Sequence, residues 1–382
     1  MNRKRLKNEK GSITLYVLIS MFFFIIVVFG IYFNTNSKMQ KQNKEIEQIQ
    51  KQYEKENIND VYEKTMKSNE KLLSEVVEVG DYVEYIPNAV STTDVTYTQL
   101  ISDLATYSGN TDSSYHTSST IIQESLNWRV LDTVKDENGN NCVRLISDKP
   151  TKTAKISLYG AKGYNNAVYL LDKTCSVLYN NSKYTQKVQN IKIEDIQRHL
   201  TYDYTQYENA NVDTGKYGGT KIYTNENYRK YPNIFIKEKT GWVDDKKGTE
   251  LEKSEQTTPI NEEATVANNN IKITQTYWSK TMVEDDFTDK KYYNLFINDG
   301  TSNYETYWMS SRCLNAYPEH VNFNISRMDG ERVYSDKLYS FENDNTIWAC
   351  AIRPIITLKC DILINSTKSG DGSEVTEAWV LR

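Results

Sequence analysis

The chain has 382 residues, of which 38% are hydrophobic and 25% charged, with a net charge of -5. This composition supports a sizeable buried core and excludes a largely disordered protein. The 29 tyrosines favour a β-rich domain with wet, solvent-facing sheets. Because basic side chains are concentrated before residue 11, the remainder is more acidic than the whole chain, which argues against nucleic acid as a partner.

Residues 13–33 carry no charged side chain, and at ~1.5 Å per residue a helix of this length crosses a hydrocarbon core of roughly 30 Å. We therefore predict a transmembrane helix at 13–33, preceded by a cytoplasmic basic segment at 1–12. A cleaved secretory signal is the alternative, but its apolar region would be shorter and end in small residues. The positive-inside rule places the N-terminus in the cytoplasm and the rest outside, although Lys38, Lys41 and Lys44 weaken the asymmetry.

The junction KGSITL at residues 10–15 resembles the basic-glycine start of type IV pilin-like and Tad-type pseudopilin sequences. In that family a dedicated peptidase cuts after the glycine, so the resemblance makes Gly11 and Ser12 a candidate processing site. The fifth residue after Gly11 is Tyr16 rather than the glutamate that pilins carry. A static membrane anchor and a processed pilin-like subunit therefore both stay open.

Residues 34–76 are rich in Lys, Glu and Gln, with apolar residues such as Ile46, Ile49 and Tyr53 three and four positions apart. This spacing predicts a long, mostly solvated helical stalk. The apolar seam lacks sustained heptads, so both a single helix and a homodimer through a two-stranded coiled coil remain open.

A globular domain is predicted at 77–361, opening with an alternating strand at 79–85 and followed by a C-terminal segment at 362–382. Its most secure hairpin is at 126–148, because Asn138-Gly139 tolerates the positive φ angles of a tight turn. The polar stretches 88–125 and 244–270 are predicted to be loop insertions.

Two helices are predicted after this hairpin. Apolar residues of segment 164–181 fall on one helical face, and Asn165 or Asn166 is placed to cap the helix. Segment 191–204 predicts a second helix with acidic residues near its N-terminus. The mixture of helices and strands indicates an α+β fold class.

Several motifs occur in a set order: WRVL (128–131), LISD (145–148), GYNNAVYLLDKTC (163–175), IEDIQRHLTYDYTQY (193–207), DTGKYGG (213–219), YWMSSR (307–312) and AIRPIITLK (351–359). Together they resemble a widespread family of bacterial surface proteins of mostly unassigned function. The terminal module resembles DUF6273-type domains, which are similar to the C-type-lectin-like fold also used by formylglycine-generating enzymes. The resemblance spans residues 77–360 and implies a C-type-lectin-like α+β domain.

The resemblance implies that YWMSSR lies on a core strand as scaffold and that Arg353 helps to fix loops. A serine nucleophile would need a histidine base held by an acid, and His116, His199 and His320 have no recognisable partner motif. The paired cysteines of the formylglycine-generating active site are not recognisable either. We therefore expect no catalytic residues and no enzyme activity.

Five cysteines show no CxxC pair and no zinc-like spacing with histidine. Given the resemblance, a disulfide between Cys175 and Cys313 is the first expectation and one between Cys350 and Cys360 the second; the alternative is that all five are buried thiols. The acidic turn at 369–374 has too few oxygens for an EF-hand. We expect no metal and no cofactor.

These observations predict a single-pass protein of a Gram-positive-type bacterial surface that displays an extracellular domain for binding or adhesion. Its partners would be the membrane and an extracellular glycan or protein ligand, whose contact residues the sequence does not identify. A pilin-like structural subunit is the alternative function.

Overall fold

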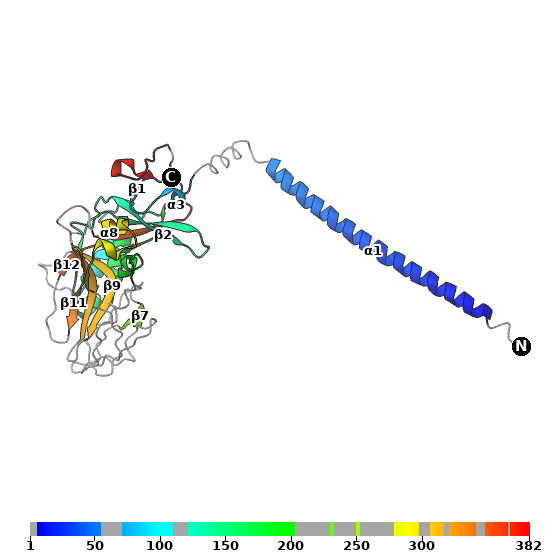
Figure 1. The fold of residues 1–382 in the computed structure, drawn as a ribbon, viewed down its shortest axis with the longest axis horizontal. Coiled ribbons are helices and arrows are strands. Elements are labelled where there is room, and N and C mark those ends of the chain that lie inside the picture. The colour runs from blue at the N-terminus through cyan, green and yellow to red at the C-terminus, as the bar shows by residue number, and fades with distance from the viewer. Residues whose placement is uncertain are drawn as a thin grey trace. The chain divides into compact units, whose positions relative to one another are not determined.

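The computed structural model describes residues 6–54, 71–109, 121–202, 230–232, 250–252, 279–297, 306–316, 321–340, 348–365 and 367–382. It divides the chain into two compact units, Met1–Asn69 and Glu70–Arg382 (Figure 1).

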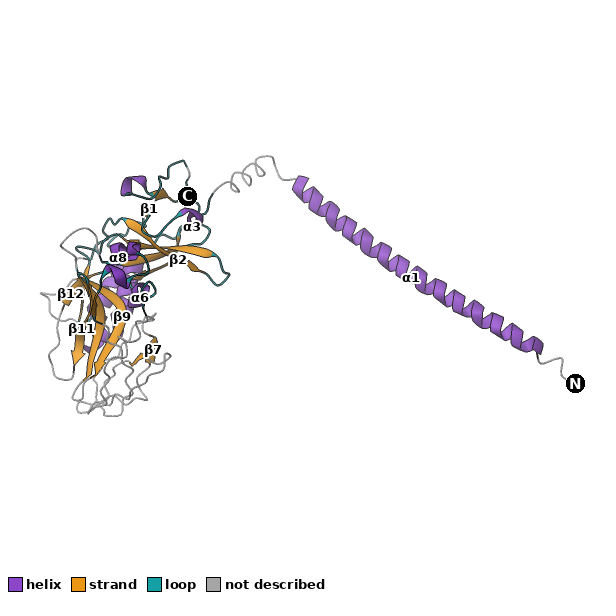
Figure 2. Cartoon of the chain, viewed as in Figure 1, coloured by secondary structure: helices purple, strands orange, loops and turns teal. Residues whose placement is uncertain are grey.

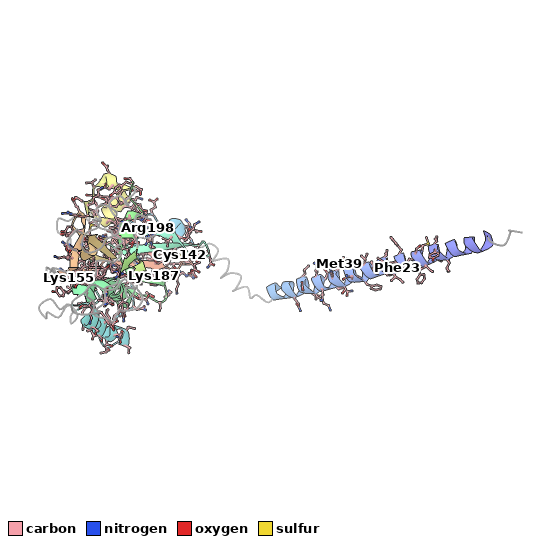
Figure 3. All side chains as sticks on the ribbon, turned by 90° about the horizontal axis from the view of Figure 1, so that it is seen from below. Phe23, Met39, Cys142, Lys155, Lys187 and Arg198 are labelled. Carbon is pink, nitrogen blue, oxygen red and sulfur yellow. A yellow bond between two sulfur atoms is a disulfide. The ribbon has the colours of Figure 1, made fainter. Side chains whose placement is uncertain are left out.

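The described part of the first unit is one helix, α1 (Leu6–Glu54). Its stretch Leu15–Gln48 is long and apolar enough to cross a membrane, and none of its most apolar window is buried by the protein. Side chains such as Phe23 and Met39 project from the helix (Figure 3), with 67% and 55% of their surfaces exposed. Such exposure of large apolar side chains is costly in water and favourable in lipid. The predicted apolar helix is therefore present, and it continues without a break into the polar sequence as far as Glu54.

The second unit begins earlier than predicted. Residues 71–76, which the sequence pattern assigns to the stalk, belong to the globular unit. The short helix α3 (Leu73–Val76) buries Leu73 in the core, and the Leu73 backbone N–H donates to the Ile362 carbonyl at 2.9 Å. Leu73 and Val76 therefore pack against the domain core and do not belong to a stalk helix.

The first sheet has six strands in the order β14-β1-β2-β3-β13-β5, and its centre is the predicted hairpin (Figure 2). Gly139 has a φ of 83° in the hairpin turn, as the Asn-Gly pair requires. The strands are β1 (Tyr82–Glu84), β2 (Trp128–Lys135), β3 (Asn141–Ser147), β5 (Thr185–Asn190), β13 (Pro354–Leu358) and β14 (Trp379–Val380).

The second sheet has the order β4-β12-β9-β10-β11-β8 and is built around a long meander. Its strands are β4 (Lys155–Leu158), β8 (Lys280–Thr281), β9 (Tyr307–Ala316), β10 (Val321–Asp329), β11 (Arg332–Ser340) and β12 (Trp348–Ala351). YWMSSR therefore lies on a central strand, β9. A separate pair, β6 (Lys230–Pro232) with β7 (Glu250–Glu252), places a strand inside the stretch 244–270 that was predicted to be loop, whose other residues lie outside the described ones.

Helix α5 (Gly160–Tyr179) packs against β5 of the first sheet and β9 and β11 of the second. Its Leu170, Leu171 and Leu178 are fully buried. The prediction that Asn165 or Asn166 caps this helix is wrong, because α5 begins five residues earlier and both side chains are completely buried inside it. The face of the first sheet turned away from α5 supplies Leu131, Ile146 and Ile355 to a second apolar cluster with α6 (Ile193–Gln197) and α8 (Lys290–Phe296).

The insertion predicted at 88–125 is not only loop, because it contains helix α4 (Val95–Tyr107). Tyr97, Leu100 and Leu104 are spaced by three and four residues and are buried against the core, which the low overall apolar content of the stretch concealed. Residues 110–120 lie outside the described part. The second predicted helix shortens to the five residues of α6.

The C-terminal segment finishes the domain. Strand β14 pairs in parallel with β1, and the Trp379 indole N–H donates to Asp81 at 3.0 Å. The second unit is thus α+β, with two mixed sheets that both pack against helix α5.

Candidate functional site

The YWMSSR strand uses its polar side chains to join elements of the core. The Trp308 indole N–H donates to the Ile156 carbonyl at 2.7 Å, and the Ser310 hydroxyl donates to Asp172 at 2.7 Å. Ser311 donates to Glu194 at 3.2 Å. No histidine lies in this set, and His116 and His320 fall outside the described residues. These contacts tie β9 to neighbouring elements, as scaffold contacts do, and among the described residues no histidine lies beside either serine.

Arg353 holds two chain segments together, as the resemblance implied. Its guanidinium donates to the carbonyls of Ser147 and Asp148 at the end of β3 and to those of Leu295 and Phe296 at the end of α8. It is 3% exposed. A buried guanidinium that satisfies several carbonyls fixes the relative position of two chain segments.

The cysteine prediction is wrong in both of its pairings. The disulfide joins Cys142 to Cys360, while Cys175, Cys313 and Cys350 are buried free thiols. Strand pairing explains the bond: Arg144 lies opposite Thr357 in the antiparallel β3–β13 ladder, so Cys142 and Cys360 meet just beyond its end. The expected Cys175–Cys313 pair is not formed: Cys175 on α5 and Cys313 on β9 are each enclosed in the core as free thiols.

Asp136 lies beside this disulfide, within 4.8 Å of both sulfur atoms. Because the two sulfurs are bonded to each other, they cannot act as thiolate ligands. In the turn at 369–374, Asp371 accepts hydrogen bonds from the backbone N–H and hydroxyl of Ser373. Asp136 is therefore the one remaining candidate ligand of its group, and Asp371 is held by Ser373.

The described residues enclose a pocket of 330 Å³ on the α6 and α8 side of the first sheet, which we call the His199 pocket. Its volume is at the lower end of the range typical of small-molecule sites. Apolar walls and a charged floor meet in it. The lining residues are Val77, Val79, Val130, Asp132, Thr133, Val134, Arg198, His199 and Tyr292.

A β-bulge creates the charged floor. The β2–β3 register shifts between Val130 and Asp132, so that Asp132 lies opposite Arg144. Arg144 donates from Nε to Asp132 Oδ1 at 2.6 Å, from Nη2 to the other oxygen, and from Nη1 to Asp195 at 2.6 Å. Burial alone would raise the pKa of Asp132, but hydrogen bonds from His199 and Arg144 outweigh it and lower the pKa well below its ordinary value. Asp132 is therefore ionised at neutral pH.

His199 forms one wall. Its Nε2 lies 3.2 Å from Asp132 Oδ2, and its ring stacks on Tyr292 with centroids 3.8 Å apart and planes inclined by 14°. Because Asp132 is ionised and can only accept, the proton of a neutral His199 is placed on Nε2. Burial and the charge of Asp132 raise the pKa of Tyr292, so its phenol stays protonated.

Arg198 lies at the open side of the pocket (labelled in Figure 3), with 41% of its side chain exposed. Its Nη1 lies 3.7 Å from Asp132 and its Nη2 lies 3.4 Å from Asp195, while its Nε donates to the Glu194 carbonyl at 3.2 Å. The two longer distances give electrostatic attraction without good hydrogen-bond geometry. At the rim, Lys291 pairs with Glu78 at 2.6 Å and joins the 77–79 segment to α8.

A buried His–Asp pair also occurs in catalytic triads, where it activates a nucleophile. The hydroxyl that lines this pocket besides Tyr292 belongs to Thr133, and in the described part of the chain no hydrogen bond joins it to His199. The described residues therefore show no hydroxyl hydrogen-bonded to His199 in this pocket.

A second pocket of 310 Å³ lies beside β1 and β14, where Glu84 and Lys368 are its charged lining residues. It lacks a buried group of ionisable side chains. We therefore take the His199 pocket as the candidate site.

Sequence reasoning missed this pocket, although it noted His199. The residues involved come from the 77–79 segment, β2, the end of α6 and α8, about 215 positions apart at the extremes, and no local motif marks them. Charged residues within the apolar runs of β2 and β3, Asp132 and Arg144, were the available signal, since unpaired charges are rarely buried.

No protein family model, no curated protein and no solved structure matches this chain.

Proposed function

We propose that the protein is a single-pass, membrane-anchored binding protein whose second unit lies outside the cell and holds an extracellular ligand. The observation that carries the proposal is the combination of α1, whose apolar surface is exposed, with a folded unit that contains a disulfide. Apolar exposure on this scale fits lipid, and structural disulfides persist in oxidising compartments outside the cytoplasm.

The basic residues before the apolar stretch support an orientation with the N-terminus in the cytoplasm. Arg3, Lys4, Arg5, Lys7 and Lys10 precede the apolar stretch, and short basic segments are retained in the cytoplasm. The second unit then emerges on the outer side after a polar helical continuation of α1.

The mode of binding rests on the scaffold. The resemblance to C-type-lectin-like surface domains is supported by the α+β arrangement of two sheets and a central helix. In such domains a stable sheet presents irregular segments, and these carry specificity. The ligand class we propose is a cell-wall or extracellular glycan or a surface protein.

The test has two parts. Epitope tags at each end of the full chain, combined with protease treatment of intact cells, should remove the C-terminal tag and spare the N-terminal one. The purified full-length chain in detergent should then be retained by an array of cell-wall polymers, glycans and surface proteins, with a chain lacking residues 71–382 as the control. Protection of the C-terminal tag in intact cells, or no retention by the array, would contradict the proposal.

A pilin-like subunit is the second candidate, favoured by the continuity of α1 through the apolar stretch and into polar sequence. Gly11 lies within that helix, five residues before Tyr16. The N-terminal sequence of the membrane-extracted protein distinguishes the two functions: a start at Ser12 supports processing and assembly, and a start at Met1 supports the static anchor.

A further inference from the structure

We propose that the His199 pocket binds the carboxylate of a small ligand with an apolar body, with Arg198 as the direct contact and His199 as a second, proton-dependent one. This inference rests on the proposed binding function and names the ligand chemistry of one site.

Arg198 can offer a two-pronged donor. Of its nitrogens, Nε is used by the Glu194 carbonyl, whereas the described residues show no hydrogen bond from Nη1 or Nη2. The side chain is 41% exposed, so a ligand can reach it. Parallel N–H groups of a guanidinium match the two oxygens of a carboxylate, and such charge-assisted pairs are stronger than neutral hydrogen bonds.

The charged floor is neutral before a ligand binds, so an added carboxylate requires one further positive charge. Arg144 and Arg198 are offset by Asp132 and Asp195, so these four groups sum to zero. Arg144 cannot serve a ligand, because each of its nitrogens already donates to an aspartate.

Protonation of His199 supplies the missing positive charge. Its Nε2 is committed to Asp132, and no hydrogen bond of Nδ1 appears among the described residues. Nδ1 is thus the atom that gains a proton when an anion binds beside it. The charged and titratable groups around it are Asp132 on β2, Arg144 on β3, Asp195 and Arg198 at α6, and Asp289, Tyr292 and the Glu78–Lys291 rim pair at α8.

The apolar walls of the His199 pocket favour a ligand with an apolar body. Four valines, from β2 and the 77–79 segment, line the pocket together with Tyr292. Buried apolar contact of this kind provides affinity, while a few polar groups fix orientation. A carboxylate on an apolar or aromatic group therefore fits better than a bare anion such as acetate.

The test measures binding to the full-length chain in detergent by calorimetry and ligand-observed NMR. Benzoate is compared with benzamide, which has the same shape without the charge. Glucuronate against glucose, and N-acetyl-alanyl-alanine against its C-terminal amide, then separate an acidic sugar from a peptide C-terminus as the natural source of the carboxylate.

We expect benzoate to bind with uptake of a proton, seen as a dependence of the binding heat on the buffer's ionisation enthalpy. Benzamide should bind at least about tenfold more weakly, and Arg198→Gln should lower benzoate affinity by a similar factor, because one charge-assisted pair is lost. Arg198→Lys should fall between the two. Arg332→Gln, at an exposed arginine of β11 outside the pocket, should match the wild type, and equal melting temperatures should show that all variants are folded.

Equal binding of benzoate and benzamide, unchanged affinity in Arg198→Gln, or no binding of any carboxylate would overturn the inference. The anchored binding function would survive each of these results if the array still retains the chain. If the C-terminal tag is protected in intact cells but the chain still binds carboxylates, the surface role is rejected and the assignment of the pocket stands.

Discussion

Arg144 donates to both carboxylate oxygens of Asp132 across the β2–β3 ladder, where a β-bulge sets the two residues opposite each other. The pair is buried, and Asp195 accepts the remaining Arg144 nitrogen at 2.6 Å. Three charges are thus satisfied by one another beneath the His199 pocket. A group of this kind stabilises the fold only while it is complete, because each member left alone is a buried charge.

Asp132→Asn is expected to lower the free energy of unfolding by about 3–5 kcal/mol, since it leaves the buried Arg144 guanidinium with Asp195 alone. Because the pKa of Asp132 is lowered in the folded state, its contribution is present above the ordinary aspartate pKa and is lost as the pH falls through the folded value. Urea unfolding of the full chain at pH 7 measures the effect. Asp361→Asn, at an exposed site, is the matched control, and equal losses in the two variants would contradict a structural role for the charge group.

The bulge also shows why sequence periodicity could not find the pocket. A strict alternation would place residues 130, 132 and 134 on one face and 131 and 133 on the other. In the structure, Thr133 joins its neighbours in lining the pocket while Leu131 enters the cluster behind α6 and α8. An inserted residue of this kind re-aims side chains without a local sequence signal.

Local signals did predict the elements that they control. The Asn138-Gly139 turn and the alternating runs beside it fix the hairpin, and the uncharged stretch at 13–33 fixes the apolar helix. Features set by distant partners were missed: α4 depends on burial of Tyr97 and Leu100, and the disulfide depends on the β3–β13 pairing. The contacts of His199 belong to this second class.

The pH dependence of stability should include an opposite contribution from Asp336 on β11. Burial raises its pKa from 3.8 to about 6, outweighing the attraction of Arg327, whose Nε lies 2.7 Å away. A raised folded pKa means that stability is present below the ordinary pKa and is lost as the pH rises through about 6. The wild type should therefore lose roughly 1–2 kcal/mol relative to Asp336→Asn between pH 4 and pH 7.5.

Thermal or urea unfolding of both chains at the two pH values gives this difference directly. Asp329→Asn is the control, since Asp329 lies 3.2 Å from the same arginine with half of its side chain exposed. A wild-type stability that does not fall relative to Asp336→Asn would contradict the assigned direction of the shift.

The disulfide assignment predicts three thiols that react only after unfolding. Burial raises the pKa of Cys350 to about 12 and that of Cys175 well above its ordinary value, so both stay protonated and unreactive in the native protein. Alkylation in denaturant without reductant should label Cys175, Cys313 and Cys350 and leave Cys142 linked to Cys360. Peptide mapping checks this, and a cross-link between Cys175 and Cys313 would contradict it.

Loss of the bond in Cys142→Ser/Cys360→Ser should lower the free energy of unfolding by about 2–4 kcal/mol, because the bond closes a long loop of the unfolded chain. The two positions are 218 residues apart in sequence. Cys175→Ser removes a buried thiol without opening a loop and serves as the comparison. The double variant should also unfold at the same urea concentration as wild-type protein whose disulfide has been reduced.

Docking of the C-terminal segment depends on Gly372, and the hairpin glycine provides an unusually close control. Both glycines have positive φ, 78° at Gly372 and 83° at Gly139, so an alanine costs about 1 kcal/mol of backbone strain at either site. At Gly139 an added Cβ meets nothing within 4 Å, but at Gly372 it would clash with Trp379 Nε1 and would lie 2.9 Å from Asp81 Cβ. Trp379 must then shift from its place beside Asp81, and we expect the pairing of β14 with β1 to weaken.

Gly372→Ala should therefore cost about 1–3 kcal/mol more than Gly139→Ala, the added cost being that of overpacking. Hydrogen exchange of the full chain should show faster exchange in residues 379–382 and at β1 for Gly372→Ala alone. Equal destabilisation and equal exchange in the two variants would mean that the 362–382 segment does not rely on the Trp379–Asp81 contact, since backbone strain would then account for the whole effect.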